Sequence, residues 1–333
     1  MKWIKGILKV LVLLIVVLII GYFLGPVADR PDFITERKQI DFNLDQLDAY
    51  VQKKEAEAGP TKEDNQARII WNDSVPTQTT YSIVYLHGFG ASQGEGAPVH
   101  ENLASAIGAN LYLSRLAGHG LKAENAFEGL TPEKYMESAA DALFIGEKLG
   151  EKVILVATST GGAQALYLAT QFPEKIAALV LYSPFIEMAD PNLQRLSTGP
   201  WHEQIAGLML EKGVSYTERP DSVAAYWSTY YHFDAYNSLF TMVKYSTTED
   251  IIQEVNVPVF LAYYYQDKEN QDDVVSVAAM KEMFENLAVE EKKAIAFPKT
   301  GNHVIASKWR SNDWPAVQDS TLQFLKEHLD LKN

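Results

Sequence analysis

Near its middle the chain reads Val153-Ile-Leu-Val-Ala-Thr-Ser159-Thr-Gly-Gly162, an apolar run that passes into small residues. Four apolar and mostly β-branched residues in succession predict a short buried strand. The segment that follows favours a helix, which should stop before Pro173. We therefore expect Ser159 on the turn between a strand and a helix.

A nucleophile elbow has this arrangement, in which a strained backbone holds a serine hydroxyl clear of the sheet. The turn requires small residues two positions before and two positions after the serine, here Ala157 and Gly161. Glycine is usual at both positions, so Ala157 is a departure, although its single methyl group should fit. The alternative is an ordinary strand-to-helix turn in which Ser159 only caps the helix.

The composition narrows the class of protein. A chain of 333 residues with 47% hydrophobic residues can bury a large core, most simply that of one α/β domain with an insertion. The formal net charge of −14, without any basic block, argues against nucleic acid as a partner. The chain has no cysteine, hence no disulfide and no thiol nucleophile, and its seven histidines show no HExxH spacing that would favour a metal site.

The N-terminal segment predicts a single-pass membrane anchor over residues 4–24. These 21 residues are nearly all apolar, which is about the length that spans ~30 Å of hydrocarbon. Because Lys2, Lys5 and Lys9 lie at its start, the positive-inside rule places the N-terminus in the cytoplasm and the main domain outside it. The alternative is a cleaved signal peptide. An uncleaved anchor is favoured because bulky residues end the run and no A-x-A site follows.

Residues 26–62 are expected to form a polar connector. Apolar residues recur in it at helical spacing, namely Leu44, Leu47, Tyr50 and Val51. This spacing predicts one amphipathic helix that ends at Gly59 and packs on the domain that follows.

The rest of the chain alternates between strand and helix patterns. Strands are predicted at residues 67–71, 81–86, 109–113, 153–156, 176–182, 257–263 and 293–297. One of the helices opens at Thr131-Pro132-Glu133, where a capping residue precedes a first-turn proline and a first-turn acid. This alternation favours a mainly parallel sheet with helices on both faces.

Two histidines with glycine neighbours follow predicted strands. The first begins His87-Gly-Phe-Gly90, a loop whose backbone can approach a substrate closely. The N–H groups of Phe89 and of Thr160, the residue after Ser159, would together form an oxyanion hole, unless the segment is only a loop. The second, His119, is interpreted as a turn-stabilising residue and not as a catalytic base.

An aromatic-rich interval of about residues 187–247 separates two of the predicted strands. It is longer than a helical crossover needs, so we expect an inserted helical cap over the strand ends. Most of its aromatic side chains should pack within the cap. Trp201 and the cluster from Trp227 to Tyr236 are the candidates for a wall of the substrate pocket.

Acidic residues and a histidine follow the last two predicted strands. Asp267, Asp272 and Asp273 lie in the loop after residues 257–263, and His303 follows the final strand. Together with Ser159 they give the chain order serine, acid, histidine, each just past the carboxyl end of a strand. In that order the histidine is the expected general base.

Taken together, the HGFG loop, the GHG segment at residues 118–120, the serine elbow, the acid loop and Gly301-Asn-His303 resemble the α/β-hydrolase superfamily. Within it, the chain is similar to monoacylglycerol lipases and carboxylesterases over a domain of residues 67–331. The resemblance implies a mostly parallel sheet of eight strands, helices on both faces, a Ser-Asp-His triad and no cofactor.

The acid loop departs from the pattern of that superfamily. Its members usually place the acid a few residues after the strand and directly before a Val-Val pair. Here a longer loop separates the two cues, so that Asp267 fits the first cue and Asp272 the second. Asp272 is favoured because the valine pair opens the helix that fixes the loop. Asp267 and then Asp273 are the alternatives.

These features predict an anchored serine hydrolase that cleaves a small-molecule ester or a lipid through an acyl-enzyme. Ser159 would be the nucleophile, His303 the base and Asp272 the acid. One alternative is an amidase or aminopeptidase, since the same triad cleaves amides. Another is a binding protein of the hydrolase fold without catalytic activity.

Overall fold

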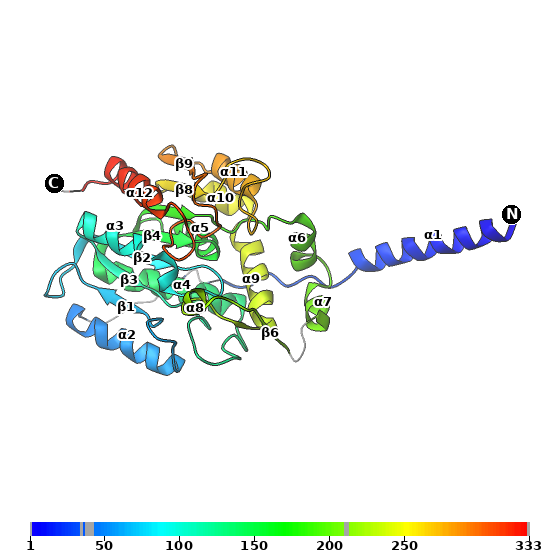
Figure 1. Ribbon diagram of the computed structural model, residues 1–333, viewed down its shortest axis with the longest axis horizontal. Helices are drawn as coiled ribbons and strands as arrows, with labels where there is room; N and C mark the ends of the chain where they lie inside the picture. The colour runs from blue at the N-terminus through cyan, green and yellow to red at the C-terminus, as the bar shows by residue number, and fades with distance from the viewer. Residues whose placement is uncertain (1, 34–35, 37–42, 210–212, 332–333) are drawn as a thin grey trace.

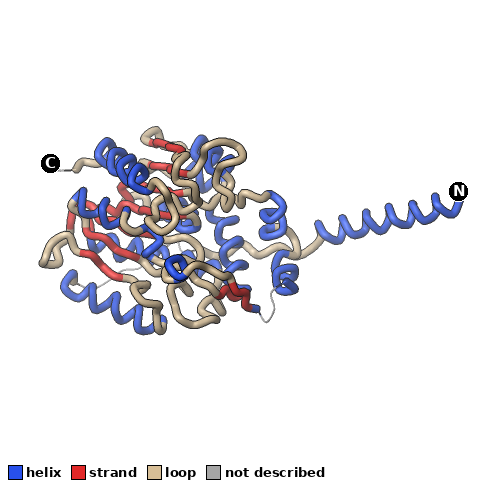
Figure 2. Tube along the Cα trace, in the orientation of Figure 1, coloured by secondary structure: helices blue, strands red, loops and turns tan. Residues whose placement is uncertain are grey.

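In the computed structural model, which describes residues 2–33, 36, 43–209 and 213–331, seven strands form one central sheet (Figures 1 and 2). The strands are β1 (Arg68–Ile70), β2 (Thr79–Leu86), β3 (Asn110–Leu113), β4 (Gly150–Thr158), β5 (Ile176–Tyr182), β8 (Val259–Tyr263) and β9 (Lys292–Ala296). Their order across the sheet is β1-β3-β2-β4-β5-β8-β9, and only the edge strand β1 runs antiparallel to its neighbour.

The predicted α/β-hydrolase fold, with helices on both faces of a mainly parallel sheet, is confirmed. The predicted eighth strand is wrong for the described residues. That number came from the superfamily, whereas the residue patterns marked seven segments. Before β1 the chain forms helix α2 (Leu44–Ala58) instead of a further strand, and this helix buries Leu47 and Val51 against the domain.

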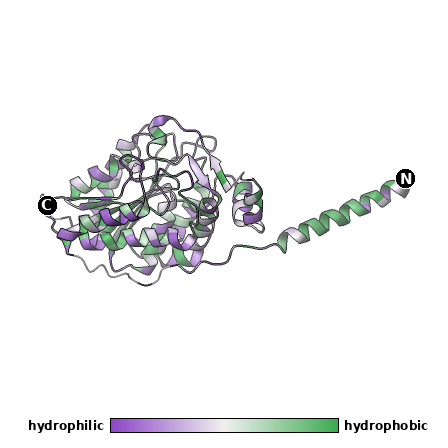
Figure 3. Ribbon diagram, turned by 90° about the horizontal axis from the view of Figure 1, so that it is seen from below, coloured by the Kyte–Doolittle hydropathy of each residue, from purple (hydrophilic) through white to green (hydrophobic). Residues whose placement is uncertain are grey.

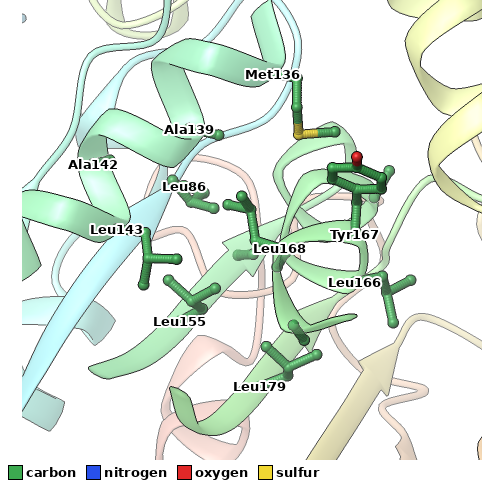
Figure 4. Packing of buried hydrophobic residues seen from close by; sticks show 14 of the residues in the cluster. Leu86, Met136, Ala139, Ala142, Leu143, Leu155, Leu166, Tyr167, Leu168 and Leu179 are labelled. Carbon is green, nitrogen blue, oxygen red and sulfur yellow. The ribbon is translucent and has the colours of Figure 1, made fainter. Parts of the chain in front are cut away.

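Alternating side chains of the central strands fill two cores. On β2, Val84 and Leu86 point into one core while Ile83 and Tyr85 point into the other. Helices α4 (Pro132–Leu149), α5 (Thr160–Gln171), α10 (Glu249–Glu254) and α11 (Val277–Asn286) cover the first core, and α3 (Val99–Ile107) and α12 (Trp314–His328) cover the second. Figure 4 shows Leu143 of α4 and Leu168 of α5 close to Leu155 of β4.

Helix α2 is fixed to the domain by polar contacts as well as by its apolar face. The Asp48 carboxylate accepts a hydrogen bond from the Trp71 indole at 2.9 Å, and Glu55 pairs with Arg115 at 2.7 Å. At its end Gly59 takes φ 109°, which favours glycine. Connector residues 34–35 and 37–42 lie outside the described residues.

The insertion after β5 contains helices and a small sheet. Its elements are α6 (Pro191–Thr198), α7 (His202–Met209), β6 (Val214–Tyr216), α8 (Asp221–Ala224), β7 (Tyr230–His232) and α9 (Phe233–Ser246). Strands β6 and β7 pair in antiparallel fashion, so the predicted helical cap also contains a small sheet that the sequence analysis did not foresee. Helix α9 packs on α4 and α5 and connects the cap to the domain. Cap residues 210–212 lie outside the described residues.

Helix α1 (Lys2–Phe23) projects from the domain as a single apolar rod (Figure 3). Between Trp3 and Leu24 every side chain but that of Tyr22 is exposed. By length and composition this helix is long enough to cross a membrane or to act as a signal sequence.

Candidate active site

Ser159 lies on a sharp turn between β4 and α5. Its φ of 53° and ψ of −116° are strained for a residue with a side chain. Hydrogen bonds from the Ser159 N–H to the Tyr182 carbonyl and from the Phe185 N–H to the Ser159 carbonyl, each 2.9 Å long, hold it in place. A Cβ on Gly161 would lie 2.2 Å from the Leu86 carbonyl oxygen, so this position requires glycine. The elbow geometry is therefore present, and Ala157 fits it while fully buried.

His303 and Asp272 meet beside this edge of the sheet. His303 Nδ1 lies 2.7 Å from Asp272 Oδ2, and both side chains are buried. The other carboxylate oxygen accepts the N–H groups of Val274 and Val275 at 2.9 and 3.0 Å. Burial opposes the charge on both groups, but their mutual attraction and hydrogen bonding outweigh it. The pKa of Asp272 is therefore lowered and that of His303 raised.

The other two candidate acids lie elsewhere in the loop. Asp267 is half-buried and closes a local turn, where its carboxylate accepts the N–H groups of Glu269 and Asn270. Asp273 is exposed and, in the described part of the chain, makes no hydrogen bond to His303. The structure thus brings Asp272 to His303 and leaves Asp267 and Asp273 apart from it.

Ser159 and His303 occupy the same edge without a direct hydrogen bond among the described residues. Ser159 follows β4 and His303 follows β9, so both side chains lie past the carboxyl ends of parallel strands. With Nδ1 bound to Asp272, His303 Nε2 is the nitrogen free to take a proton. Such contacts are often long without substrate and shorten in the complex.

Two backbone N–H groups beside Ser159 are without partners in the described structure. Thr160 is the first residue of α5, where helix geometry leaves the N–H unsatisfied, and Phe89 lies in the loop after β2. His87 fixes that loop, because its Nε2 accepts the Leu116 N–H at 3.1 Å. Burial lowers the pKa of His87 to about 4, so the ring stays neutral and keeps this role.

The sequence comparisons agree with this geometry. Residues 77–306, more than half of the chain, match a hydrolase family described as serine aminopeptidase, S33. The chain belongs to this family. It is also 32% identical, over 109 residues, to a protein named as an esterase/lipase in Mycoplasma pneumoniae, a match that spans 33% of this chain and 40% of that protein.

Solved structures support the hydrolase fold. One of two metagenome-derived lipolytic enzymes, LipS and LipT, superposes with a TM-score of 0.65 and 18% identity, over 80% of this chain and 100% of that one. The monoacylglycerol lipase of Paleococcus ferrophilus superposes with a TM-score of 0.58 and 18% identity, over 79% of this chain and 98% of that one. A soluble variant of the monoglyceride lipase of Saccharomyces cerevisiae superposes with a TM-score of 0.59 and 16% identity, over 79% of this chain and 91% of that one. At these identities the likeness concerns the fold alone.

His119 has the structural position expected for it in this hydrolase. It is fully buried, with Nδ1 2.8 Å from the Ala117 carbonyl oxygen and its ring stacked on Tyr135 at 5.1 Å. Burial and the neighbouring His87 hold its pKa well below the ordinary value, so it is neutral. It therefore supports the turn and does not serve as a second base.

The sequence reasoning missed Glu95, a buried acid beside the nucleophile. It lies in the short helix η1 (Gln93–Gly96), and its Oε2 accepts the Gly88 N–H at 2.7 Å and the Tyr85 hydroxyl at 2.9 Å. A Cβ on Gly88 would lie 2.9 Å from Glu95 Oε1 and 3.2 Å from Ser159 Cβ, so Gly88 adjoins both the carboxyl and the nucleophile. An acid between two glycines directly after the HGFG loop was the available signal.

Glu95 titrates close to neutrality. Burial raises its pKa to about 7, against the lowering by its two hydrogen bonds and by the charge of His303. Tyr85, Tyr135 and Tyr231 also face it, and their own pKa values are raised by burial, so they remain neutral. The ionised carboxyl in turn helps to raise the pKa of His303.

Replacing Glu95 should therefore move the pH profile. Glu95→Gln removes one of the negative charges that favour protonated His303, so the acid limb of kcat/KM should shift to lower pH. The shift should be on the order of half a pH unit, less than the 1–3 units of a charge in contact. Tyr85→Phe keeps the carboxyl but removes one of the hydrogen bonds that lower its pKa, so less of Glu95 is ionised and the acid limb should move in the same direction by a smaller amount. Equal profiles for Glu95→Gln and wild type would contradict this coupling.

Part of the cap lies directly on the loop after β2, which contains Phe89 and is the candidate oxyanion loop. The Tyr231 ring is 5.3 Å from the Phe89 ring, and a Cβ on Gly90 would come within 2.1 Å of the Tyr231 hydroxyl. Trp227 packs with Ala91 at one end of the same loop. The predicted aromatic cluster from Trp227 to Tyr236 is therefore next to the site. Trp201 is not part of this cluster, because it packs against the end of α1.

Proposed function

We propose that the chain is a serine hydrolase that cleaves carboxylic esters through an acyl-enzyme. The observation that carries the proposal is the 2.7 Å bond between His303 Nδ1 and Asp272 Oδ2 at the sheet edge that also holds the strained Ser159 elbow. The chemistry of acyl transfer needs a nucleophile, a base in a fixed tautomer and donors for a developing oxyanion. The residues at this edge supply all three.

In the proposed reaction Ser159 Oγ attacks the ester carbonyl and His303 Nε2 takes its proton. The carbonyl oxygen becomes an oxyanion, which accepts the N–H groups of Phe89 and Thr160. The intermediate then collapses, the C–O bond to the alcohol breaks, and His303 gives its proton to the leaving alcohol. Water repeats the sequence on the acyl-enzyme and releases the acid. Asp272 holds the imidazole tautomer and stabilises the imidazolium throughout.

An amidase or aminopeptidase is the second candidate, because the family match carries an aminopeptidase description. The surroundings of the site favour an ester. Rings of Phe89, Tyr231 and Tyr236 lie within 5.3–5.7 Å of one another beside the oxyanion loop, and such rings suit an apolar acyl chain. We assign the hydrolase domain to residues 67–331, with the cap at about residues 187–247.

Turnover of a graded set of substrates tests this choice. Each acyl methylene removed from water by an apolar wall gains about 0.8 kcal/mol, so kcat/KM should rise with acyl length until the pocket is full. We expect an optimum at short to medium chains among p-nitrophenyl esters from acetate to palmitate. Amino-acid p-nitroanilides should react more slowly. Faster cleavage of the anilides would favour the aminopeptidase, and a flat ester profile would show that the cap does not line the acyl site.

For location, we propose that residues 4–24 are an uncleaved single-pass anchor with the N-terminus in the cytoplasm and the hydrolase domain outside it. The length of α1 and the lysines at its start support this orientation. The hydrogen bond from the Trp201 indole to the Gly21 carbonyl supports retention of the helix, because cleavage after the apolar run would remove this partner of the cap.

A further inference from the structure

The end of α1 is bound to the cap of the hydrolase. The Trp201 indole donates a hydrogen bond to the Gly21 carbonyl at 3.1 Å, and the Trp201 backbone N–H donates to the Pro26 carbonyl at 2.8 Å. A Cβ on Gly25 would lie 1.9 Å from the indole nitrogen, so the ring rests directly on the backbone of that glycine. The Tyr245 hydroxyl of α9 donates to the Ala28 carbonyl at 2.9 Å.

These contacts belong to the boundary of an apolar helix. The Gly21 carbonyl is in the last turn of α1, where helix geometry leaves carbonyl groups without intrahelical partners. If α1 spans a bilayer, an unpaired carbonyl at this boundary would be costly next to hydrocarbon, and the indole N–H supplies its partner. Tryptophan is also the side chain that favours the membrane–water interface, with its ring in the apolar layer and its N–H bonded.

The two cap helices beside this junction carry exposed apolar side chains. Figure 1 shows α6 and α7 on either side of the chain where it leaves α1. Leu208 is 88% exposed, the most exposed large apolar residue outside α1 in the described chain, and Leu193 is 47% exposed. Arg195 of α6 and Glu203 of α7 are the charged residues of these helices, and their opposite charges cancel. A neutral surface of this kind suits a zwitterionic lipid layer, whereas anionic lipid would repel the acidic domain.

Helix α9 joins this junction to the proposed active site. Tyr245 near its end binds the Ala28 carbonyl in the segment that follows α1, and Tyr236 near its start packs on Phe89 of the oxyanion loop. The two tyrosines are nine positions apart, which is about 14 Å along a helix. Helix α9 therefore links the end of α1 to the loop that holds Phe89.

We propose that α6 and α7 rest in the interfacial layer of the bilayer that α1 spans, so that the cap takes ester substrates from the membrane surface. This inference rests on the proposed anchoring and hydrolase activity, and it names the substrate class as a membrane-resident lipid ester. The lipid surface covers Leu193 and Leu208, while Trp201 fixes the cap to the anchor.

Labelling at single cysteines tests where the cap lies. The natural chain has no cysteine, so each of Leu208→Cys, Leu193→Cys, Val75→Cys and Leu14→Cys gives one site for an environment-sensitive fluorophore. The full chain is reconstituted in phosphatidylcholine vesicles that carry nitroxide quenchers on their acyl chains. Val75 is the matched control, because it is 65% exposed and lies in the loop between β1 and β2, away from α1. The fluorescence of labels at positions 208 and 193 should be quenched and blue-shifted, and that of the label at position 75 should not.

The label at position 14, within α1, separates the two proposals. Quenching at 14 without quenching at 208 and 193 would overturn the placement of the cap and leave the anchor standing. No quenching at 14 would overturn the anchor and the cap placement together. Neither result depends on catalytic activity, so a failure of the proposed reaction is distinguished from both.

Activity on two presentations of substrate tests the consequence. Leu208→Asp places a charge in the lipid layer, so kcat/KM for a monoacylglycerol held in phosphatidylcholine vesicles should fall roughly tenfold. Hydrolysis of soluble p-nitrophenyl butyrate should stay unchanged, and Val75→Asp should alter neither. Equal loss on both substrates, or no loss on either, would contradict entry of substrate from the membrane.

Discussion

Ser159→Ala should lower kcat for p-nitrophenyl butyrate by at least ~10⁴-fold, in keeping with the removal of single triad members in other serine hydrolases. The substitution deletes the oxygen that forms the acyl-enzyme and leaves the backbone donors in place. Because alanine tolerates the φ of 53° no better than serine does, the elbow itself should change little. Any residual rate would come from Phe89, Thr160 and substrate binding alone.

The control for this experiment is the folded state of the variant. An unchanged Tm and circular dichroism spectrum would show that the loss is chemical. A fluorophosphonate probe, which reacts with an activated serine, should label the wild-type chain at Ser159 and leave the variant unlabelled. Turnover close to wild type in purified Ser159→Ala would exclude the proposed mechanism. A wild-type chain that neither accepts the probe nor cleaves any ester would favour the alternative of a binding protein without catalysis.

The parts of the fold that the sequence predicted well depend on neighbouring residues. The elbow needs an apolar run, small residues around Ser159 and a helix-forming segment, all within about twenty positions. The helix from Leu44 is visible for the same reason, since its buried positions repeat every three or four residues. Such local cues predicted all seven strands of the central sheet, whereas the expected eighth strand came from the resemblance to the superfamily.

The parts that were missed depend on contacts between distant residues. Glu95 is held beside the site by hydrogen bonds to Tyr85 and Gly88, and no local sequence pattern predicts these contacts. Trp201 was expected at the pocket because it is aromatic and lies in the cap. Its indole instead binds Gly21, which is 180 positions earlier in the chain. Strands β6 and β7 are three residues each, too short for a period-two pattern to be recognised.

Asp272→Asn should lower kcat by ~10²–10⁴-fold, because an amide can donate to His303 Nδ1 and so stabilise the wrong tautomer of the ring. The charge that raises the pKa of His303 also disappears while burial remains, so the residual activity should extend to lower pH than in wild type. The measurement is kcat and kcat/KM against pH with a soluble ester, for Asp272→Asn, Asp267→Asn and Asp273→Asn in parallel.

The two neighbouring variants are matched controls, since each also loses one carboxylate in the same loop. Asp267 accepts hydrogen bonds from the N–H groups of Glu269 and Asn270, and an asparagine oxygen can keep them, so Asp267→Asn should cost less than about tenfold. Asp273 is exposed and acts on His303 only through its charge, which implies a small shift of the acid limb. A greater loss in Asp267→Asn than in Asp272→Asn would mean that the loop rearranges when substrate binds and delivers the earlier acid to His303. That outcome would overturn the assignment of Asp272, because a 2.7 Å bond formed only in the unliganded state could not orient the base during the reaction.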